Sequence, residues 1–311
     1  MEVGAPKTVE VPSRRFGRYV IRSHLGAGGM AEVFLADAIP LRGDKFPVAL
    51  KLMRKNAPPE AFADEADLMG LLDHPNLVRL LETGQAFGRP FIAMEFLVGG
   101  DLKRLMEAHE TLKRRIPLGT AVHICIEVLR GLAYFHQART RSGRPLELVH
   151  GDVNPSNIFF SGDADVKLGD FGVATARGVD IGPQAGIAAG KLHYLSPEQT
   201  RGEPLTPASD LFSLGIVLLE LVDAHPFLRE ETDAQVVMEA IRAAKVSLPD
   251  SIDPALGQIM RKALAAEPDS RYPTAGAFAG ALLTWALDSG HSPTRHNVQA
   301  WLMKTLSYAG L

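Results

Sequence analysis

The first third of the chain consists of short apolar runs separated by polar and glycine-containing segments. Between two of these runs, apolar residues recur at helical spacing and predict one helix over residues 58–72. Residues 1–15 are polar and contain two prolines, and we expect them to form a mobile tail. The predicted strands span residues 18–25, 31–36, 47–52, 78–81 and 90–96.

After Gly99 and Gly100 the apolar residues follow the periodicity of helices. A strand-rich part followed by a helix-rich part predicts an α+β fold with two segregated lobes. We expect a small β-rich lobe with one main helix at residues 16–97 and a larger, mostly helical lobe at residues 98–285. The helices predicted in the large lobe span residues 117–137, 209–222, 234–244, 253–265 and 274–287.

Residues 286–311 are expected to form a C-terminal helical extension. Ser292 supplies a helix cap and Pro293 suits the first helical position, so the sequence predicts a helix over residues 292–307. One apolar stripe favours a helix docked on the large lobe, and a helix that binds a partner is the alternative. The stripe consists of Val298, Trp301, Leu302 and Leu306.

Composition is that of an ordinary globular protein, with 46% apolar and 22% charged residues in a chain of 311. The formal net charge of -3 gives no basic surface for nucleic acid, so no nucleic-acid partner is expected. Cys125 is the single cysteine, which excludes an intramolecular disulfide. The longest apolar stretch, Leu211–Val222, is too short to span a bilayer, and the first residues lack the apolar core of a secretory signal. We therefore expect a cytoplasmic protein with no membrane segment.

Two features of the small lobe suit phosphate binding. In LGAGGMAEVFLA, Gly26 and Gly28 lie between two strand-like runs, and glycine lets a backbone approach a phosphate closely or adopt a positive φ. An ordinary glycine hairpin is the alternative. Lys51 ends the run VALK, and Glu65 follows 14 residues later on the predicted helix. A lysine held by a carboxylate can bind two phosphates, whereas a lysine alone usually points into solvent.

The large lobe contains two short polar motifs. HGDVNPSN ends at Asn157, and LGDFG contains Asp170, 18 residues after Asp152. Carboxylate and amide oxygens are ligands that Mg²⁺ prefers, and an aspartate that binds no metal can accept the proton of an incoming hydroxyl. A lone DFG tripeptide is often an ordinary turn, but here the other motifs accompany it in order.

Taken in order, these motifs resemble the eukaryotic-type (Hanks-type) protein kinase family, and specifically bacterial serine/threonine protein kinases. Further segments agree with the resemblance: FIAMEFLVGGDL between the lobes, the SPE tripeptide that ends at Glu198, SDLFSLG with Asp210, and DSRYP with Arg271. The resemblance covers about residues 16–285 and implies the two-lobed kinase fold. It also implies ATP and Mg²⁺ as cofactors and a protein as substrate.

The resemblance implies a role for each matching residue. Lys51 would hold the α- and β-phosphates of ATP and pair with Glu65. Asp152 would orient the substrate hydroxyl, while Asn157 and Asp170 would hold Mg²⁺. Glu198 and Arg271 would form a structural ion pair in the large lobe.

Other residues would surround the nucleotide. The backbone of Glu95 and Leu97 would meet the adenine, with Met94 behind it, and Asp101 would reach the ribose. Together, the residues that the resemblance places around ATP are Leu25, Gly26, Gly28, Val33, Ala49, Lys51, Glu65, Met94, Glu95, Leu97 and Asp101.

The sequence departs from the family pattern at the glycine loop and at the arginine of HRD. Ala31 replaces the third glycine, which is a mild change. Gly151 stands where many of these kinases have an arginine that meets a phosphate on the activation loop. Thr175 is the only hydroxyl residue between Val173 and Ala189. Both facts predict an enzyme that does not depend on activation-loop phosphorylation.

A further departure lies in the catalytic loop itself. Asn154 stands where the family usually has a lysine that neutralises the γ-phosphate, and Lys191 stands where serine/threonine kinases usually have a threonine. We hypothesise a swap in which Lys191 supplies the charge that Asn154 lacks. A surface lysine beside a degraded loop is the alternative.

Two rival functions remain open at this point. A pseudokinase that binds ATP as a switch or scaffold would bind without turnover, although such proteins often lose residues equivalent to Asp152, Asn157 and Asp170. A small-molecule kinase of the same fold would rarely carry the SPE tripeptide with the later Asp210 and Arg271. The absence of an arginine between Asp152 and Asn157 favours serine and threonine over tyrosine. The oligomeric state and the protein substrate are left open.

Overall fold

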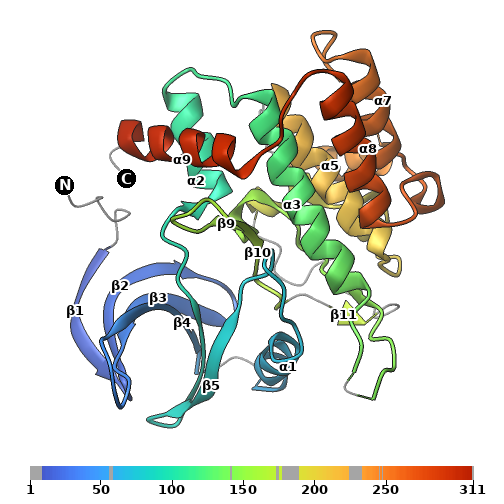
Figure 1. The fold of residues 1–311 in the computed structure, drawn as a ribbon. Coiled ribbons are helices and arrows are strands. Elements are labelled where there is room, and N and C mark those ends of the chain that lie inside the picture. Colours follow the sequence, from blue (N-terminus) through green and yellow to red (C-terminus); the bar gives the residue numbers. More distant parts are fainter. Residues whose placement is uncertain are drawn as a thin grey trace.

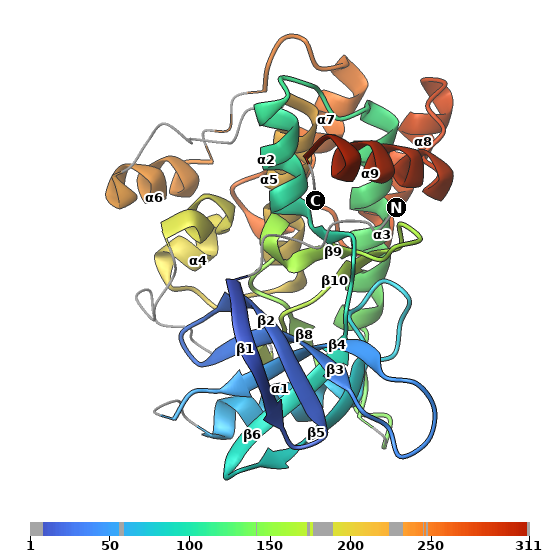
Figure 2. The same ribbon diagram turned by 90° about the vertical axis from the view of Figure 1, so that its left-hand side faces the viewer.

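The computed structural model describes residues 9–55, 59–140, 142–172, 175–176, 189–223, 233–244, 246 and 248–309. Figure 1 shows two lobes: the strands of the first third lie together at one end, and most of the helices lie at the other. The view in Figure 2, turned by 90°, shows the same separation. The predicted α+β fold with two lobes is therefore confirmed.

The small lobe is built on one antiparallel sheet of six strands in the order β1-β2-β3-β4-β6-β5. The alternating burial of β4, with Val48, Leu50 and Leu52 inside, shows why this segment forms a strand with one face on the core. The helix α1 (Pro59–Met69) is the predicted helical insert. The strands are β1 (Val9–Phe16), β2 (Tyr19–Ala27), β3 (Ala31–Ala38), β4 (Phe46–Met53), β5 (Leu80–Ala86) and β6 (Arg89–Glu95).

Strand β1 covers residues for which we expected a mobile tail. Gly17, with φ of +57°, makes the tight reversal that pairs Phe16 with Tyr19 and starts the ladder between β1 and β2. Phe16 is buried and its ring meets Phe91 edge to face at 5.9 Å. The polar composition of residues 9–15 concealed this strand, because an edge strand needs few buried side chains.

The large lobe begins with α2 (Leu102–Thr111), which we had not predicted, and with the long α3 (Leu118–His136). The predicted helices are present to within about three residues at each end. The C-terminal helix predicted over residues 292–307 is present as the 15-residue α9. The remaining helices are α4 (Pro197–Arg201), α5 (Pro207–Asp223), α6 (Ala234–Arg242), α7 (Pro254–Ala263), α8 (Ala275–Asp288) and α9 (Arg295–Ala309), with short 3-10 turns η1 (Pro155–Asn157), η2 (Ala189–Tyr194) and η3 (Pro268–Ser270).

Two small sheets lie where the lobes meet. One has the order β10-β9-β7 and the other pairs β8 with β11. Their strands are β7 (Gly100–Asp101), β8 (Leu148–Val149), β9 (Ile158–Phe160), β10 (Val166–Leu168) and β11 (Thr175–Ala176).

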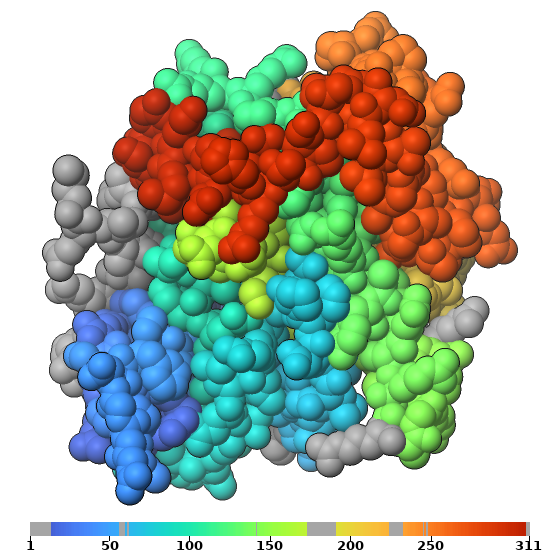
Figure 3. Space-filling model, in the orientation of Figure 1, coloured from blue at the N-terminus to red at the C-terminus, as the bar shows by residue number. Residues whose placement is uncertain are grey.

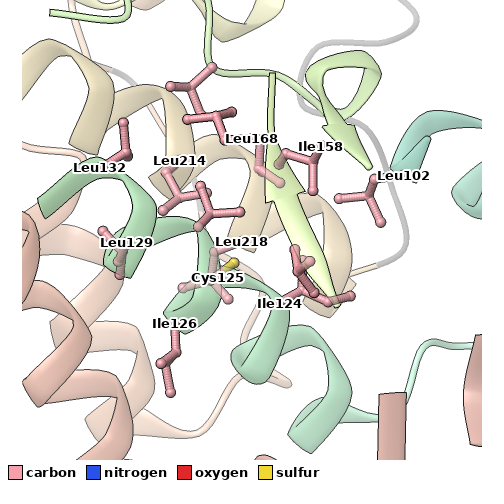
Figure 4. Close-up of a cluster of buried hydrophobic side chains, with 14 of the residues drawn as sticks. Leu102, Ile124, Cys125, Ile126, Leu129, Leu132, Ile158, Leu168, Leu214 and Leu218 are labelled. Atoms are coloured by element: carbon pink, nitrogen blue, oxygen red, sulfur yellow. The ribbon is translucent and has the colours of Figure 1, made fainter. Parts of the chain in front are cut away.

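The core of the large lobe forms around α3 and α5. Figure 4 shows Cys125 and Leu129 of α3 facing Leu214 and Leu218 of α5, with Leu168 of β10 above them. Burial raises the pKa of the Cys125 thiol far above its ordinary value, because the thiolate would lose its hydration. Within the described residues, α3 is the one helix long and apolar enough to cross a membrane, but 67% of it is buried inside the structure. We assign it to the core.

Candidate active site

The glycine-rich segment forms the turn between β2 and β3. Gly28 donates its N–H to the carbonyl of Ala31, 2.8 Å away, which closes the turn. Neither Gly26 nor Gly28 has a positive φ, so that reason for glycine does not apply here. A Cβ at Gly26 would meet no atom within 4 Å, and one at Gly28 only the Ala31 carbonyl at 3.9 Å. The space beside these backbones is therefore open for a close approach by a ligand.

Lys51 lies on β4 and reaches two carboxylates. Its Nζ is 2.6 Å from Oε1 of Glu65 on α1 and 3.1 Å from Oδ1 of Asp170. Burial alone would lower the pKa of Lys51, but the charges of Asp170 and Glu65 outweigh it and raise the pKa above its ordinary value. Lys51 is thus a fixed cation at the junction of the lobes.

Glu95, the last residue of β6, anchors the start of the segment that joins the lobes. Oε1 of Glu95 accepts hydrogen bonds from the N–H of Arg79 and from Nζ of Lys167 on β10, both at 2.8 Å. Both charged side chains are largely buried, with 13% exposed for Lys167 and 19% for Glu95. No pattern in the sequence pointed to Lys167.

The other residues expected around the nucleotide come from these same elements. Val33 pairs with Gly26 across β2 and β3, and Ala49 of β4 pairs with Met94 of β6. Leu25 is 36% exposed near the glycine turn. Leu97 follows β6 and is buried.

Asp101 ends strand β7 and begins α2. Its carboxylate accepts the N–H of Arg104 at 3.0 Å and so caps the helix. Burial raises the pKa of Asp101 above its ordinary value. Gly99 must be glycine because an added Cβ would lie 2.7 Å from the carbonyl oxygen of Phe160 on β9. This close approach fixes the segment that precedes α2 against β9, the strand that follows the polar loop described next.

The loop after β8 encloses the carboxylate of Asp152, whose side chain is 12% exposed. The amide of Asn154 donates to Oδ1 of Asp152 at 2.8 Å, and the amide of Asn157 donates to Oδ2 at 2.9 Å. The Asn154 side chain also accepts the N–H of Ser156 at 2.9 Å and thereby caps η1. Two neutral amides therefore fix both oxygens of this carboxylate.

Lys191 completes the surroundings of Asp152. It lies in η2, 39 residues later in the chain, and its Nζ forms an ion pair with Oδ2 of Asp152. The Lys191 side chain is 34% exposed, so its ammonium is open to a bound group. Of the candidate catalytic residues Asp152, Asn154, Lys191 and Lys51, the structure brings the first three into contact. Lys51 contacts Asp170 instead.

The backbone of the loop is held by a buried carboxylate. Asp210 of α5 accepts the N–H groups of His150 and Gly151 at 2.9 and 2.8 Å, and it bonds Nε2 of His136 at 2.7 Å. Burial alone would raise the pKa of Asp210, but the interactions with His136 and His150 outweigh burial and lower this pKa. Gly151 has a φ of +72°, a conformation that glycine adopts without strain. Gln199 of α4 then donates to the Gly151 carbonyl at 2.8 Å, a contact that sequence reasoning missed.

Asn157 precedes β9 and Asp170 follows β10, so both lie at the open end of the β9–β10 hairpin. At this end the N–H of Gly169 donates to the Asn157 carbonyl at 2.9 Å. Because both amide hydrogens of Asn157 point at Asp152, its side-chain oxygen is directed away as an acceptor. Partial desolvation opposes ionisation of Asp170, but the charges of Lys51 and Lys191 outweigh it and lower the pKa. One carboxylate and one amide oxygen fit a Mg²⁺ ion that also binds phosphates. Among the described residues no group of three or more His, Cys, Asp or Glu could hold a metal by itself.

The segment after the DFG motif is described only in part. Thr175 lies in β11 and its backbone pairs with Val149 of β8. Residues 173–174 and 177–188 lie outside the described residues, so the expectation about activation-loop phosphorylation falls mostly outside them.

The predicted ion pair of the large lobe is present. Arg271 and Glu198 form two parallel hydrogen bonds of 2.7 and 2.8 Å, and their side chains are 0% and 2% exposed. Arg271 also donates to the carbonyls of Ala208, Ala265 and Ala266. The pair therefore ties α4 to the start of α5 and to the loop that precedes η3.

Comparison with known proteins agrees with this geometry. The family model described as the protein kinase domain matches residues 19–280. The chain is 37% identical over 280 residues to the tyrosine-protein kinase MasK of Myxococcus xanthus, covering 87% of this chain and 43% of that protein. It is 33% identical over 273 residues to the serine/threonine-protein kinase PrkC of Bacillus subtilis, covering 85% and 40%. It is also 32% identical over 289 residues to the serine/threonine-protein kinase PknB of Mycolicibacterium smegmatis, covering 88% and 43%.

The chain thus spans less than half the length of these curated relatives. The family match at residues 19–280 includes both polar motifs and most of the two-lobed part described above. Together with the similarity to these relatives, this match, which includes more than four fifths of the residues, shows that the chain belongs to the protein kinase family.

Proposed function

We propose that this protein is an active protein kinase that transfers the γ-phosphate of Mg-ATP to a serine or threonine hydroxyl of a protein. The observation that carries the proposal is the enclosure of Asp152 by Asn154, Asn157 and Lys191. The two amides orient both carboxylate oxygens without neutralising them, which suits a group that must accept the hydrogen of an incoming hydroxyl.

Each neighbouring residue has a part in this proposal. Lys51, fixed by Glu65, would hold the α- and β-phosphates. Asn157 and Asp170 would hold Mg²⁺, which would neutralise phosphate charge there. The turn at Gly26 and Gly28 would cover the phosphates, and the backbone of Glu95 and Leu97 would meet the adenine. Asp101 would reach the ribose.

Lys191 is proposed to supply the positive charge that Asn154 lacks. Its ion pair with Asp152 puts a partly exposed ammonium beside the carboxylate that would meet the substrate. Such a charge can stabilise a transferred phosphoryl group, since fixed donors act most strongly where charge develops. Asn154 instead acts as a positioning residue for Asp152 and for η1.

The enzyme is also proposed to be independent of activation-loop phosphorylation. Gly151 offers no guanidinium for a phosphate to bind, and its carbonyl is already bonded by Gln199. The loop between β8 and η1 is thus held by Gln199 and Asp210 without any phosphate.

A specificity for tyrosine is the second candidate, because the relative MasK is named a tyrosine-protein kinase. The lack of an arginine between Asp152 and Asn157 and the names of PrkC and PknB favour serine and threonine. A pseudokinase is the remaining alternative, and the paired Lys51 and Glu65 argue against it.

The experiment incubates the purified protein with Mg-ATP and a generic basic protein and follows phosphate transfer by intact mass. The matched control is Asp152→Asn, which keeps the shape of the side chain but removes the carboxylate. Transfer by the wild type alone, with phosphoserine or phosphothreonine in the acid hydrolysate, is the expected result. Phosphotyrosine would establish the second candidate, and nucleotide binding without transfer would establish a pseudokinase.

A further inference from the structure

Helix α9 lies outside the part of the chain that the family model matches, which ends at residue 280. It nevertheless packs against both α2 and α3. Its buried residues Val298, Trp301, Leu302 and Thr305 form one face, all exposed by 5% or less. Figure 3 shows the α9 segment (red) lying directly against the β9–β10 segment (yellow-green).

The first contact of α9 is with the turn of the β9–β10 hairpin. Nε of Arg295 donates to the carbonyl of Asp163 at 2.8 Å, and a terminal guanidinium nitrogen lies 3.1 Å from Oδ1 of Asp165. The opposite end of this hairpin carries Asn157 and, two residues after β10, Asp170. The helix therefore contacts the hairpin whose open end presents both proposed Mg²⁺ ligands.

The second contact supports strand β9 from outside. The indole ring of Trp301 meets the ring of Phe160 with centroids 5.7 Å apart. Phe160 pairs with Val166 of β10 on one side and with Gly100 of β7 on the other. Phe160 thus joins the hairpin to β7, which leads directly into α2. The position of Phe160 therefore sets how far the start of α2 lies from the hairpin.

The third contact is with α2, whose N-terminal cap is Asp101. The indole N–H of Trp301 donates to Nε2 of His109 at 2.7 Å, and the hydroxyl of Thr305 lies 2.8 Å from the same nitrogen. All three side chains are buried. Helix α2 also packs against η1, which ends at Asn157.

From these contacts we propose that α9 is a positioning helix for the Mg-nucleotide site, with Trp301 and Arg295 as its positioning residues. Through α2, this helix positions Asp101 at the ribose end of the site. Through the β9–β10 hairpin, it positions Asn157 and Asp170 at the metal end. It thereby keeps the two ends at a fixed separation. This inference rests on the proposed function, because it assumes that Asp101, Asn157 and Asp170 bind the nucleotide and its metal. A helix that only stabilised the lobe would change unfolding without changing nucleotide affinity.

The test compares three variants by circular dichroism, by the Kd for Mg-ATP, and by kcat and KM. Trp301→Phe keeps an aromatic ring at this position but loses the donor to His109 and part of the volume of the indole. Arg295→Ala removes the exposed guanidinium from the hairpin turn and leaves no cavity. Met303→Ala is the matched control, because Met303 lies on the same helix and is 53% exposed.

We expect Trp301→Phe and Arg295→Ala to weaken Mg-ATP binding by about threefold to tenfold, while the control stays within about twofold of the wild type. We expect KM for ATP to rise more than kcat falls. Amide exchange in residues 157–170 should become faster in both variants and stay unchanged in the control.

Folded variants with the wild-type Kd, or an equal loss of affinity in Met303→Ala, would overturn the inference. The proposed function would fail in a different way, by wild-type binding of Mg-ATP without phosphate transfer. The comparison of Kd values would still decide the role of α9 in that case. A wild type that binds no Mg-ATP would overturn both.

Discussion

At the scale of single residues, the site is a set of charges whose partners differ in kind. Asp152 meets two amides and one ammonium, while Lys51 meets two carboxylates. Amides orient a carboxylate but leave its charge intact, whereas an ammonium compensates that charge. Lys191 is therefore the residue near Asp152 whose removal should affect charge more than geometry.

For that reason we expect Lys191→Met to lower kcat by roughly a hundredfold and to change the Kd for Mg-ATP by less than about threefold. The ammonium would act on the transferred group, whereas Lys51 and the β9–β10 hairpin would hold the nucleotide. Steady-state kinetics with isothermal titration measures both quantities. Lys191→Arg, which keeps the charge, should recover part of the rate. Unchanged turnover in Lys191→Met would refute the swap of charge from residue 154 to residue 191.

The ion pair of Arg271 with Glu198 supports stability without touching the site. Both side chains are almost fully buried, so Arg271→Met leaves the carboxylate of Glu198 without its cation. We expect a loss of about 3–5 kcal/mol in the free energy of unfolding, measured by urea titration. The double variant that also carries Glu198→Gln should lose less than the sum of the two single changes. Strict additivity would show that the pair is not coupled.

At the scale of elements, the segment between the DFG motif and α4 contains Thr175, the residue on which activation-loop phosphorylation would occur. The loop at Gly151 is already held by Gln199 and Asp210, so a phosphate on Thr175 would find no arginine there. We expect Thr175→Ala to keep more than about a third of the wild-type kcat, because residue 151 is a glycine and offers no guanidinium to a phosphate. Activity below a tenth would contradict independence from phosphorylation. Mass spectrometry of the wild type, before and after phosphatase treatment, provides the control.

The contact between α2 and α9 should make stability sensitive to pH. The indole N–H of Trp301 donates to Nε2 of His109, so this nitrogen must be unprotonated. Burial lowers the pKa of His109 below its ordinary value of 6.5. The unfolded chain therefore binds more protons between the two pKa values, and stability is complete above about pH 6.5 and falls as the pH drops through this window.

We expect His109→Gln, whose side-chain oxygen can still accept the indole N–H, to lose less stability than the wild type between pH 7.5 and pH 5.5. Thermal unfolding at the two pH values measures the difference. His74 and His123, whose pKa values burial also lowers, are present in both proteins and cancel in the comparison. An equal loss in both proteins would show that His109 is not the titrating group.

Sequence patterns predicted the elements whose own residues carry a clear signal. The α3 and α5 helices were predicted because apolar residues recur at helical spacing within each of these segments. Strand β1 and helix α2 were missed, since β1 is stabilised by pairing with β2 and α2 by its cap Asp101 and its contact with α9. The start of α9 was placed too early: Thr294, rather than Ser292, bonds the N–H of Asn297 and caps the helix.

The same distinction applies to the site. The motif residues Lys51 and Glu65 could be named from their order in the chain, and their ion pair is present. Lys167 and Gln199 could not, because their importance comes only from the distant residues that folding brings to them. A lysine in an alternating strand has no local pattern that distinguishes it from a solvated one.

At the scale of the whole molecule, the two lobes meet through charges as well as through packing. Lys51 belongs to the small lobe and Asp170 to the large one, and the 3.1 Å contact between them crosses the junction. If Mg²⁺ binds between Asp170 and the phosphates while Lys51 holds those phosphates, the bound nucleotide links both lobes. Such a ligand stabilises the folded chain by mass action, by about 2.7 kcal/mol at a concentration one hundred times the Kd.

This linkage gives a prediction that does not depend on catalysis. In the wild type, we expect ATP to raise the midpoint of thermal unfolding by about 5 °C with Mg²⁺ and by much less with EDTA, because metal and nucleotide bind together. In Asp170→Asn the two shifts should become nearly equal, since the carboxylate that binds the metal is gone while Lys51 and Glu65 remain. Asp269→Asn, which changes an exposed acid in η3, should behave as the wild type. A Mg²⁺-dependent shift that survives in Asp170→Asn would place the metal elsewhere, and the nucleotide would then link the lobes through Lys51 alone.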